Sequence, residues 1–445
     1  MAKKRFYQPA RILTLSFFAA IVAGSLLLTL PSSARSERIP YIDALFTSTS
    51  ALCVTGLVVV DTPTSFSASG QLIIIALIQL GGLGIMTFSS LILLVAGGKI
   101  SFSDRLLVQS TFHPSAAKNF KSLVLNVFLF TAALEAAGTL SLFLRFRRTF
   151  APARALALSA FHAISAFCNA GFSLFRGNLT SYRGDWTVNI TIMLLIILGG
   201  LGFFVLQEGA GDLKRFLGRG AVRFPLHSKL VFAMTAVLVL VPALILFLIE
   251  MPGSMSGYSL REKVLSSFFQ VVTARTAGFN TVDLTAFGSA SVVLLMLLMF
   301  IGASPGSTGG GVKTTTVGVV LAFLRSKVRA RDSTGVFRRT IPAADVTKAY
   351  TVISLAIGLV FLSSFVILLD QPGLSLQEVL FEVFSAFGTV GLSLGITAKL
   401  SVISKVVLIL TMYIGRVGPV TLLFALSRYR AIGRYEYAEE DVMIG

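Results

Sequence analysis

The segment GASPGSTGGGVKTTT, residues 302–316, contains glycines, hydroxyl side chains and one lysine, which are the residue types of a phosphate-binding loop. Such a loop has the spacing G-x-x-x-x-G-K-[S/T] between a strand and a helix, where backbone N–H groups surround the phosphates. Here Val312 precedes Lys313, where the motif has glycine, and apolar segments flank the stretch. The sequence therefore predicts no nucleotide site in this chain.

Four further segments share one pattern of phenylalanine, small residues and a final glycine. They read LFTSTSALCVTG (45–56), AFHAISAFCNAG (160–171), SFFQVVTARTAG (267–278) and LFEVFSAFGTVG (380–391). Phenylalanine stands ten residues before each final glycine. The segments recur about every 110 residues, which indicates repeated structural units.

The final glycines Gly56, Gly171, Gly278 and Gly391 suit the binding of a monovalent cation by backbone oxygens. Glycine adopts dihedral angles that other residues avoid, so four turns around one axis can direct their carbonyl oxygens to a common point. A ring of carbonyls can replace the hydration shell of a cation, and the negative ends of the preceding short helices add to its stabilisation. The alternative is that small residues only allow tight helix packing, which does not account for the matching phenylalanines.

The elements that must position these turns belong in a membrane. The chain of 445 residues is 55% hydrophobic and 13% charged, its mean hydropathy is +0.84, and soluble domains carry about 25% charged residues. Eight apolar runs are candidates to cross ~30 Å of hydrocarbon as helices: residues 12–30, 72–96, 123–143, 188–206, 230–249, 292–301 with 317–324, 351–369 and 402–426. Only the sixth of these runs is expected to be interrupted.

The short segments, of about twelve residues, cannot cross a bilayer and are too apolar for open water. They are expected to be re-entrant half-helices, because non-helical backbone at membrane depth must be buried in protein or line a cavity. The predicted fold is an all-α membrane protein with four pseudo-symmetric M1–pore-loop–M2 repeats, eight transmembrane helices in all, around a central pore. We place the repeats at residues 1–98, 99–210, 211–328 and 329–430, with a cytoplasmic tail at 431–445.

Most lysines and arginines lie in segments on the same side as the N-terminus, so both termini are expected to be cytoplasmic. The cluster Arg145, Arg147, Arg148 and Arg154 opposes this rule. The net charge of +18 sits in short loops between apolar runs. Membrane insertion explains that pattern without a nucleic-acid partner, and attraction to anionic membrane lipids is a further expectation.

The motifs CVTGL, CNAGFS, RTAGFN and GTVGLS, together with GASPGSTGGGVKT in the third repeat, closely resemble the membrane subunit of bacterial Ktr potassium transporters (KtrB). That family belongs to the Trk/Ktr/HKT superfamily. The resemblance covers essentially the whole chain, and the combination of motifs is specific although each motif alone is weak. It implies potassium uptake across the bacterial cell (inner) membrane by a chain with the four-repeat fold.

The resemblance also assigns residues to a selectivity filter. In that family glycine at all four turns goes with potassium selectivity, whereas serine in the first repeat occurs in sodium-transporting plant relatives, so Gly56 favours potassium. The residues implied to line the filter are Val54, Thr55, Gly56, Asn169, Ala170, Gly171, Thr276, Ala277, Gly278, Thr389, Val390 and Gly391. The implied K⁺ ligands are Thr55, Gly56, Ala170, Gly171, Ala277, Gly278, Val390 and Gly391.

The interruption in the third repeat, directly below the filter, is interpreted as a gate. Small residues and a proline break the helix there, so we expect a flexible strand with hydroxyls and a lysine inside the permeation path. The gate loop comprises Gly302, Ala303, Ser304, Pro305, Gly306, Ser307, Thr308, Gly309, Gly310, Gly311, Val312, Lys313 and Thr314.

Arg416, in MYIGRVGP, lies within the last apolar run, where a charge is costly and faces a cavity or a partner. We expect it to project into the pore below the filter and to repel cations enough for K⁺ to leave, and the resemblance supports this role. The alternative is a structural ion pair, for example with Glu382. Structural roles are expected for the other polar residues of the apolar segments: Glu135, His162, Cys53 and Cys168.

The resemblance implies a homodimer with one pore per protomer, docked on a cytoplasmic octameric ring (KtrA) that binds ATP, ADP or NAD-type nucleotides. K⁺ is the transported ion, sodium stimulation is known in the family, and no catalytic constellation in the sequence indicates an enzyme. Two rival functions stay open. One is a secondary carrier for another small substrate, although carriers with broken helices usually have two inverted repeats. The other, which the failed match to the phosphate-loop motif disfavours, is a membrane enzyme with a nucleotide site at residues 302–316.

Overall fold

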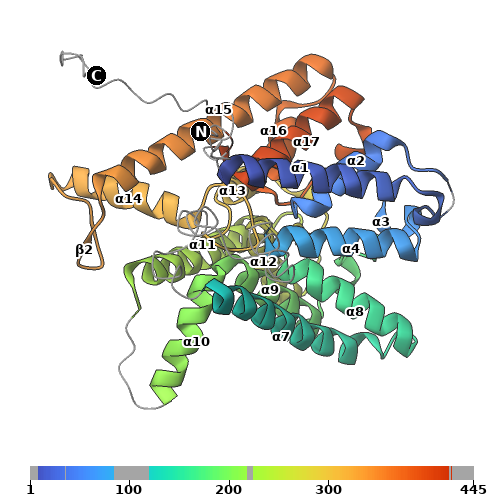
Figure 1. Cartoon of the computed structure of the whole chain (residues 1–445), viewed down its shortest axis with the longest axis horizontal. Coiled ribbons are helices and arrows are strands. Elements are labelled where there is room, and N and C mark those ends of the chain that lie inside the picture. The colour runs from blue at the N-terminus through green and yellow to red at the C-terminus, as the bar shows by residue number, and fades with distance from the viewer. Residues whose placement is uncertain (1–8, 36, 85–119, 218–223, 420–421, 423–445) are drawn as a thin grey trace, which may run out of the picture.

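The computed structural model describes residues 9–35, 37–84, 120–217, 224–419 and 422, and these are predominantly helical (Figure 1). The sheet in this part of the chain is a two-stranded antiparallel hairpin of β1 (Gly335–Val336) and β2 (Arg339–Thr340). In its register Gly335 pairs with Thr340, and Val336 pairs with Arg339.

Three kinds of helix recur four times in the same order: a first helix, a short helix and a second helix. The first helices are α1 (Pro9–Leu28), α7 (Phe120–Phe146), α11 (Leu226–Glu250) and α15 (Ala343–Asp370). The short helices are α2 (Tyr41–Leu52), α8 (Pro152–Phe167), α12 (Leu260–Ala274) and α16 (Leu376–Gly388). The second helices are α4 (Ala68–Leu83), α9 (Trp186–Leu201), α13 (Ser289–Phe300) and α17 (Val402–Val417). We call these groups units 1 to 4 in chain order.

Within the described ranges, two further helices follow second helices, namely α10 (Phe203–Leu217) after α9 and α14 (Thr314–Val328) after α13. Short turns of helix connect the rest. They are η1 (Pro31–Ser33), α3 (Thr62–Ser65), η3 (Thr180–Tyr182), η4 (Leu284–Ala286) and η5 (Thr397–Lys399).

Polar side chains start many of these helices. Capping boxes begin α12 and α16, where Ser259 and Ser375 exchange hydrogen bonds with Glu262 and Glu378. The backbone N–H and hydroxyl of Ser259 donate to Glu262 and hold the pKa of that carboxyl below its usual value. Glu262 is therefore ionised at neutral pH, beside the positive end of the α12 dipole.

The four units pack in a closed ring. The second helix of each unit contacts the short helix of the next unit: α4 packs on α8, α9 on α12, α13 on α16 and α17 on α2. The last of these contacts returns from unit 4 to unit 1. An ion pair joins the same two helices, with Lys405 Nζ 2.7 Å from Asp43 Oδ1.

Among the described residues, three helices are long and apolar enough to cross a membrane: α7 over Leu125–Phe146, α11 and α15. The bent pair α9–α10 makes a fourth if it counts as one span, and α1, α4 and α13 contain shorter apolar helices. Leucines on the outside of these helices, such as Leu72, Leu240 and Leu369, are 69%, 57% and 67% exposed. Large exposed apolar faces of this kind suit hydrocarbon rather than water.

The second helices correct one prediction. Three of them end at a glycine with a positive φ: Gly84 (78°) after α4, Gly202 (95°) after α9 and Gly418 (92°) after α17. At Gly202 the chain bends by 103° into α10. The prediction that only the third unit's second helix is interrupted is therefore wrong. These glycines lie inside apolar runs, and hydropathy carries no information about backbone dihedral angles.

Some sequence predictions concern residues outside the described ranges. They include the boundary between residues 98 and 99, the tail at 431–445 and the later parts of the apolar runs 72–96 and 402–426. Within the described chain, α10 continues across the boundary placed between residues 210 and 211, and α14 ends at Val328.

Candidate functional site

The four segments that end in glycine each consist of a short helix and a turn. The phenylalanines of the pattern help to anchor the short helices, since Phe46 and Phe381 are completely buried and Phe161 is 6% exposed. In each turn the residue two positions before the final glycine has a positive φ: 51° at Val54, 59° at Asn169, 85° at Thr276 and 51° at Thr389. Positive φ is uncommon outside glycine, and such backbone strain clusters at functional sites.

The final glycines also have positive φ, at 91° for Gly56, 68° for Gly171, 80° for Gly278 and 93° for Gly391. Their Cα atoms face the next turn so closely that a Cβ atom would collide with a backbone oxygen there. The colliding oxygen is that of Ala170 for Gly56, Ala277 for Gly171, Val390 for Gly278 and Thr55 for Gly391. Since the fourth turn meets the first, the turns form a closed ring that has no room for side chains at these positions.

Hydrogen bonds inside each turn use the backbone N–H groups. The N–H groups of Thr55, Ala170 and Val390 donate to serine carbonyls of the preceding short helices at 2.7–2.8 Å. Gly56 N and Gly391 N donate to the hydroxyls of Ser50 and Ser385, both at 3.0 Å. Within the described chain, no protein donor bonds the carbonyl oxygens of residues 54–56, 169–171, 276–278 and 389–391. The ring therefore has oxygens without a protein donor in the described chain, whereas most of its N–H groups donate to the protein.

The third turn departs from this pattern. Val272 stands where the other units have a serine, so no hydroxyl is available to the turn. Ala277 N and Gly278 N both donate to the carbonyl of Thr273, at 2.8 and 3.4 Å. Backbone hydrogen bonds take the place of the serine contact in this turn, and the Arg275 guanidinium donates to the hydroxyl of Thr235 on α11 at 3.4 Å.

Residues 301–313, between α13 and α14, form a folded loop that contacts the ring. Ile301 and Val312 pair in a parallel bridge, and Ala303 N donates to Gly310 O at 3.4 Å. The ammonium group of Lys313 lies 2.8 Å from Gly309 O. The sequence suggested a flexible strand here, whereas the loop is folded on itself by these internal hydrogen bonds.

The loop also contacts units 2 and 4. Ser304 N donates to Gly200 O (3.0 Å) and Thr308 N to Gly199 O (3.2 Å), both at the end of α9. The hydroxyl of Thr308 donates to Phe167 O at 3.1 Å, at the end of α8. The side-chain amide of Asn169 in the second turn also bonds that hydroxyl, at 3.0 Å.

Toward unit 4, Gly310 N donates to the hydroxyl of Thr389 at 3.0 Å. Gly311 N donates to Gly415 O at 3.4 Å. Through Asn169 and Thr389 the loop therefore bonds directly to two of the four turns.

Arg416 joins the loop to unit 1. Its guanidinium donates to Thr308 O in the loop and to Gly81 O near the end of α4. The alternative of an ion pair with Glu382 is not what the structure contains, because Glu382 accepts hydrogen bonds from Ser393 and Thr397. The carbonyl of Gly81 was missed by sequence reasoning. The recurrence of GGLG at 81–84 and 199–202 is the signal that could have found it.

Other buried polar side chains lie behind the turns. Gln79 Nε2 donates to Glu135 Oε2 at 3.2 Å, and the Cys168 thiol lies 3.5 Å from Gln79 Oε1. Cys53 and Cys168 are free and buried. In the described part of the chain no group of three or more His, Cys, Asp or Glu residues could hold a metal ion.

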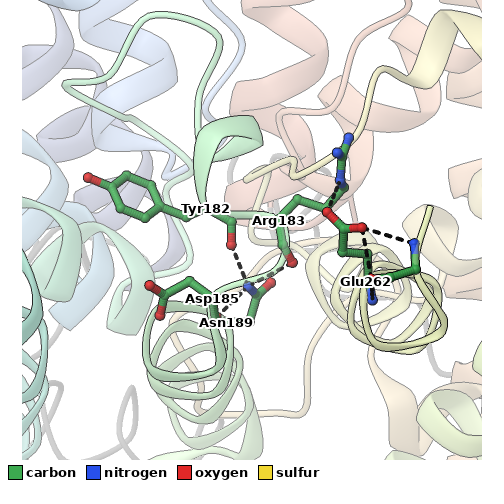
Figure 2. Close-up of polar contacts among 6 residues, drawn as sticks. Tyr182, Arg183, Asp185, Asn189 and Glu262 are labelled. Atoms are coloured by element: carbon green, nitrogen blue, oxygen red, sulfur yellow. Dashed lines mark hydrogen bonds and ion pairs between the residues drawn. The ribbon is translucent and has the colours of Figure 1, made fainter. Parts of the chain in front are cut away.

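An ion pair that the sequence did not indicate joins units 2 and 3 (Figure 2). Arg183 Nε lies 3.2 Å from Glu262 Oε1 at the start of α12, and the Arg183 guanidinium stacks 3.8 Å from the ring centre of Tyr258. Asn189 of α9 holds the segment that carries Arg183, since its amide donates to the carbonyls of Tyr182 and Arg183 at 2.8 and 3.2 Å.

Comparison with known proteins finds one family over the whole chain. The sequence model of the TrkH family, described as a cation transport protein, matches residues 3–430. The chain is 40% identical to Ktr system potassium uptake protein B of Bacillus subtilis, over 99% of this chain and 97% of that protein. It is 37% identical to the potassium/sodium uptake protein NtpJ of Enterococcus hirae, over 98% of this chain and 97% of that protein.

The fold has a counterpart among solved structures. The crystal structure of the potassium transporter TrkH from Vibrio parahaemolyticus matches with a TM-score of 0.73 at 21% identity, and the match covers 96% of this chain and 86% of that one. The sequence relatives are transport proteins rather than enzymes. Their similarity and the apolar helices make this chain an integral membrane protein. The chain belongs to the TrkH family of cation transport proteins.

Proposed function

We propose that the chain takes up potassium across the cell membrane through a selectivity filter that its four glycine turns form around a central pore. The observation that carries this proposal is the closed ring of turns. Each final glycine abuts a carbonyl of the next turn, and the carbonyl oxygens of the turns have no protein donor within the described chain. Oxygens in that arrangement can replace the water around a monovalent cation, and the C-terminal ends of the four short helices add negative potential.

Potassium is the cation that best fits the proposal. The Bacillus subtilis and Enterococcus hirae relatives are both named for potassium uptake, and the second is named for sodium as well. All four turns end in glycine, so backbone carbonyls alone define the ring. Sodium then acts as a second, modulating cation in this proposal.

The loop at residues 302–314 and Arg416 form the proposed gate and electrostatic barrier. The loop is bonded to turns 2 and 4, and Arg416 donates to the carbonyl of Thr308 in the loop. A cation that leaves the ring on this side meets a guanidinium and the Lys313 ammonium. Both groups repel it, so binding in the filter stays weak enough for exit.

The remaining proposals follow the Ktr relatives. Because the chain resembles one component of a Ktr system, we propose that it works as a homodimer with a cytoplasmic nucleotide-binding ring as its regulatory partner. Both termini are then cytoplasmic. Movement of α14, which begins directly after the loop, is the proposed route from that partner to the gate.

Replacement of Gly56 tests the filter. Gly56→Ser places a side chain at φ 91° and against the carbonyl of Ala170, so we expect a lower preference for K⁺ over Na⁺. The measurement is ⁸⁶Rb⁺ uptake into liposomes with purified protein, in competition with external K⁺ or Na⁺.

Gly177→Ser is the matched control, because Gly177 has φ 70° but lies outside the ring, beside only the hydroxyl of Thr180. This control is expected to keep the preference of the unaltered protein. A folded Gly56→Ser protein with unchanged preference would contradict the filter. Uptake of an organic solute without Rb⁺ uptake by the unaltered protein would favour the secondary carrier instead.

A further inference from the structure

Two buried titratable side chains occupy the same position in units 2 and 4. His162 and Glu382 each stand nine residues before the final glycine of their turn, and they are 0% and 1% exposed. The proposed ion path uses neither of them. The equivalent residues in units 1 and 3 are Thr47 and Phe269.

His162 bonds the segment that follows the second turn. Its Nδ1 lies 2.7 Å from Leu158 O, which can only accept, so Nδ1 carries the proton. Its Nε2 accepts from Leu174 N at 3.4 Å and lies 2.9 Å from the hydroxyl of Ser173, which therefore donates to it. The Ser173 oxygen in turn accepts from Phe175 N at 3.0 Å.

Glu382 makes the same contact in unit 4 with different chemistry. Its Oε2 accepts from the hydroxyl of Ser393 at 2.8 Å, and Oε1 accepts from Thr397. The Ser393 oxygen accepts from Gly395 N at 2.9 Å. In both units the serine stands two residues after the final glycine. The N–H group that donates to the serine oxygen stands four residues after the same glycine. A base and an acid thus act as equivalent acceptors.

Units 1 and 3 lack this link. The hydroxyl of Thr47 has no partner among the described residues, and Val58 stands where a serine would be needed. In unit 3, Asn280 at that position donates to Val282 O at 3.3 Å instead, and Phe269 offers no acceptor. Phe269 also shows that an apolar side chain fits at the position. The acceptors in units 2 and 4 are therefore not a requirement of packing.

We propose that His162 and Glu382 are positioning residues of the cation site, which fix the outer ends of turns 2 and 4 through Ser173 and Ser393. The inference rests on the proposed function of the ring. Turns 2 and 4 lie across the ring from each other, because the final glycines abut only the neighbouring turns in chain order, with the fourth turn next to the first. The linked serines fix the backbone that leaves Gly171 and Gly391, and hence the direction of those carbonyls. The ring is then held rigidly along one diagonal.

Removal of the serine hydroxyls tests the proposal. Ser173→Ala and Ser393→Ala remove the serine bond from His162 or Glu382, while Leu174 N and the Thr397 hydroxyl still donate to these acceptors. The serine that follows the turn is then no longer fixed. We expect each variant to lower the K⁺ over Na⁺ preference in liposome uptake by about fivefold, which corresponds to one typical hydrogen bond. Ser393→Thr keeps a hydroxyl at the same atom and is expected to retain the preference.

Thr47→Val is the matched control, because it removes a hydroxyl from the equivalent position of unit 1 that has no partner. It is expected to leave the preference unchanged. Thermal unfolding of the purified variants reports on folding. If an alanine variant does not fold, Ser393→Cys, with a thiol that is a weak donor, gives the same test.

The outcomes distinguish failure of the positioning role from failure of the proposed potassium uptake. The positioning role alone is overturned if the unaltered protein prefers K⁺ over Na⁺ and the folded Ser173→Ala and Ser393→Ala variants keep that preference. A lower unfolding temperature with unchanged preference also overturns it, because the link would then be purely structural. Unaltered protein without K⁺ preference overturns the proposed function itself.

Discussion

Arg416 connects three units with one side chain. It lies on α17 of unit 4, and its guanidinium donates to Thr308 O in the unit 3 loop and to Gly81 O in unit 1. These acceptors are 108 and 335 residues away in the sequence. A planar guanidinium has separate N–H groups for two acceptors, whereas a lysine ammonium is a compact point charge. Arg416 is therefore a tether for the loop as well as a charge near the ring.

Two substitutions of Arg416 distinguish the effect of its positive charge from the effect of its hydrogen bonds to the loop. Arg416→Gln removes both, so we expect higher Rb⁺ flux in liposomes without any partner protein, by about tenfold or more for the loss of a charged hydrogen bond. Arg416→Lys keeps the positive charge but lacks the planar guanidinium that donates to two acceptors, so it is expected to give an intermediate Rb⁺ flux. Equal flux in the three proteins, all folded by thermal unfolding, would contradict both roles.

Single residues also show what the sequence can reveal about the site. The spacing of Gly56, Gly171, Gly278 and Gly391 identified the turns, because each unit repeats the same local requirement for positive φ. The partners of Arg416 could not be identified in this way. They are backbone carbonyls, which every residue has, so no side-chain pattern marks them.

At the scale of elements, the loop between α13 and α14 is the most connected irregular segment among those described. It is bonded to the ends of α8 and α9, to the turns of units 2 and 4, and to Arg416. Such a segment is stable only while its neighbours keep their positions. In the proposed mechanism these contacts hold the gate closed, and a shift of α14 breaks them together.

Deletion of residues 305–312 removes these contacts. We expect a raised ion flux that no longer responds to nucleotide on the regulatory partner. The measurement is Rb⁺ uptake into liposomes with and without the partner and ATP or ADP. A deletion variant that is folded but inactive would argue against the gate.

The elements were only partly predictable from the sequence. Pro305 and the glycines around it indicated the break in unit 3, whereas Gly84, Gly202 and Gly418 lie within runs that look continuous. In an apolar run a glycine can be helical, as Gly81 and Gly82 are in α4, or it can end the helix, as Gly84 does. Tertiary contacts decide between the two. For Gly202 the contact is the loop itself, since Phe203 N donates to Gly306 O at 3.0 Å.

In the molecule as a whole, the contact between α17 and α2 closes the ring of four helical units. Lys405 and Asp43 form the ion pair at this junction, and their side chains are 13% and 14% exposed. The sequence indicated four similar units but not which faces meet, because the two residues are 362 positions apart and neither belongs to the repeated pattern. The same holds for Arg183 and Glu262 between units 2 and 3.

Loss of the ion pair between Lys405 and Asp43 is expected to destabilise the packing of the four units. Lys405→Met or Asp43→Asn leaves the other group largely buried without its partner, so each should lower the free energy of unfolding by about 1–3 kcal/mol, the cost of an unsatisfied buried polar group. The double variant should lose less than the sum, because the removed interaction is shared. Thermal unfolding in detergent measures the cycle, and strictly additive losses would show that the pair does not join the units.

The position of the loop in a single unit has a consequence for how the protein responds to control. Four turns form the ring, but in the part of the chain that the structure describes this loop follows only the second helix of unit 3. In the proposed mechanism, one pore therefore opens by a single event, and no concerted movement of four equivalent gates is required. The flux through many molecules then follows the fraction of loops that have moved. The flux then depends on nucleotide concentration as steeply as the regulator's own response does, because the pore adds no cooperativity of its own.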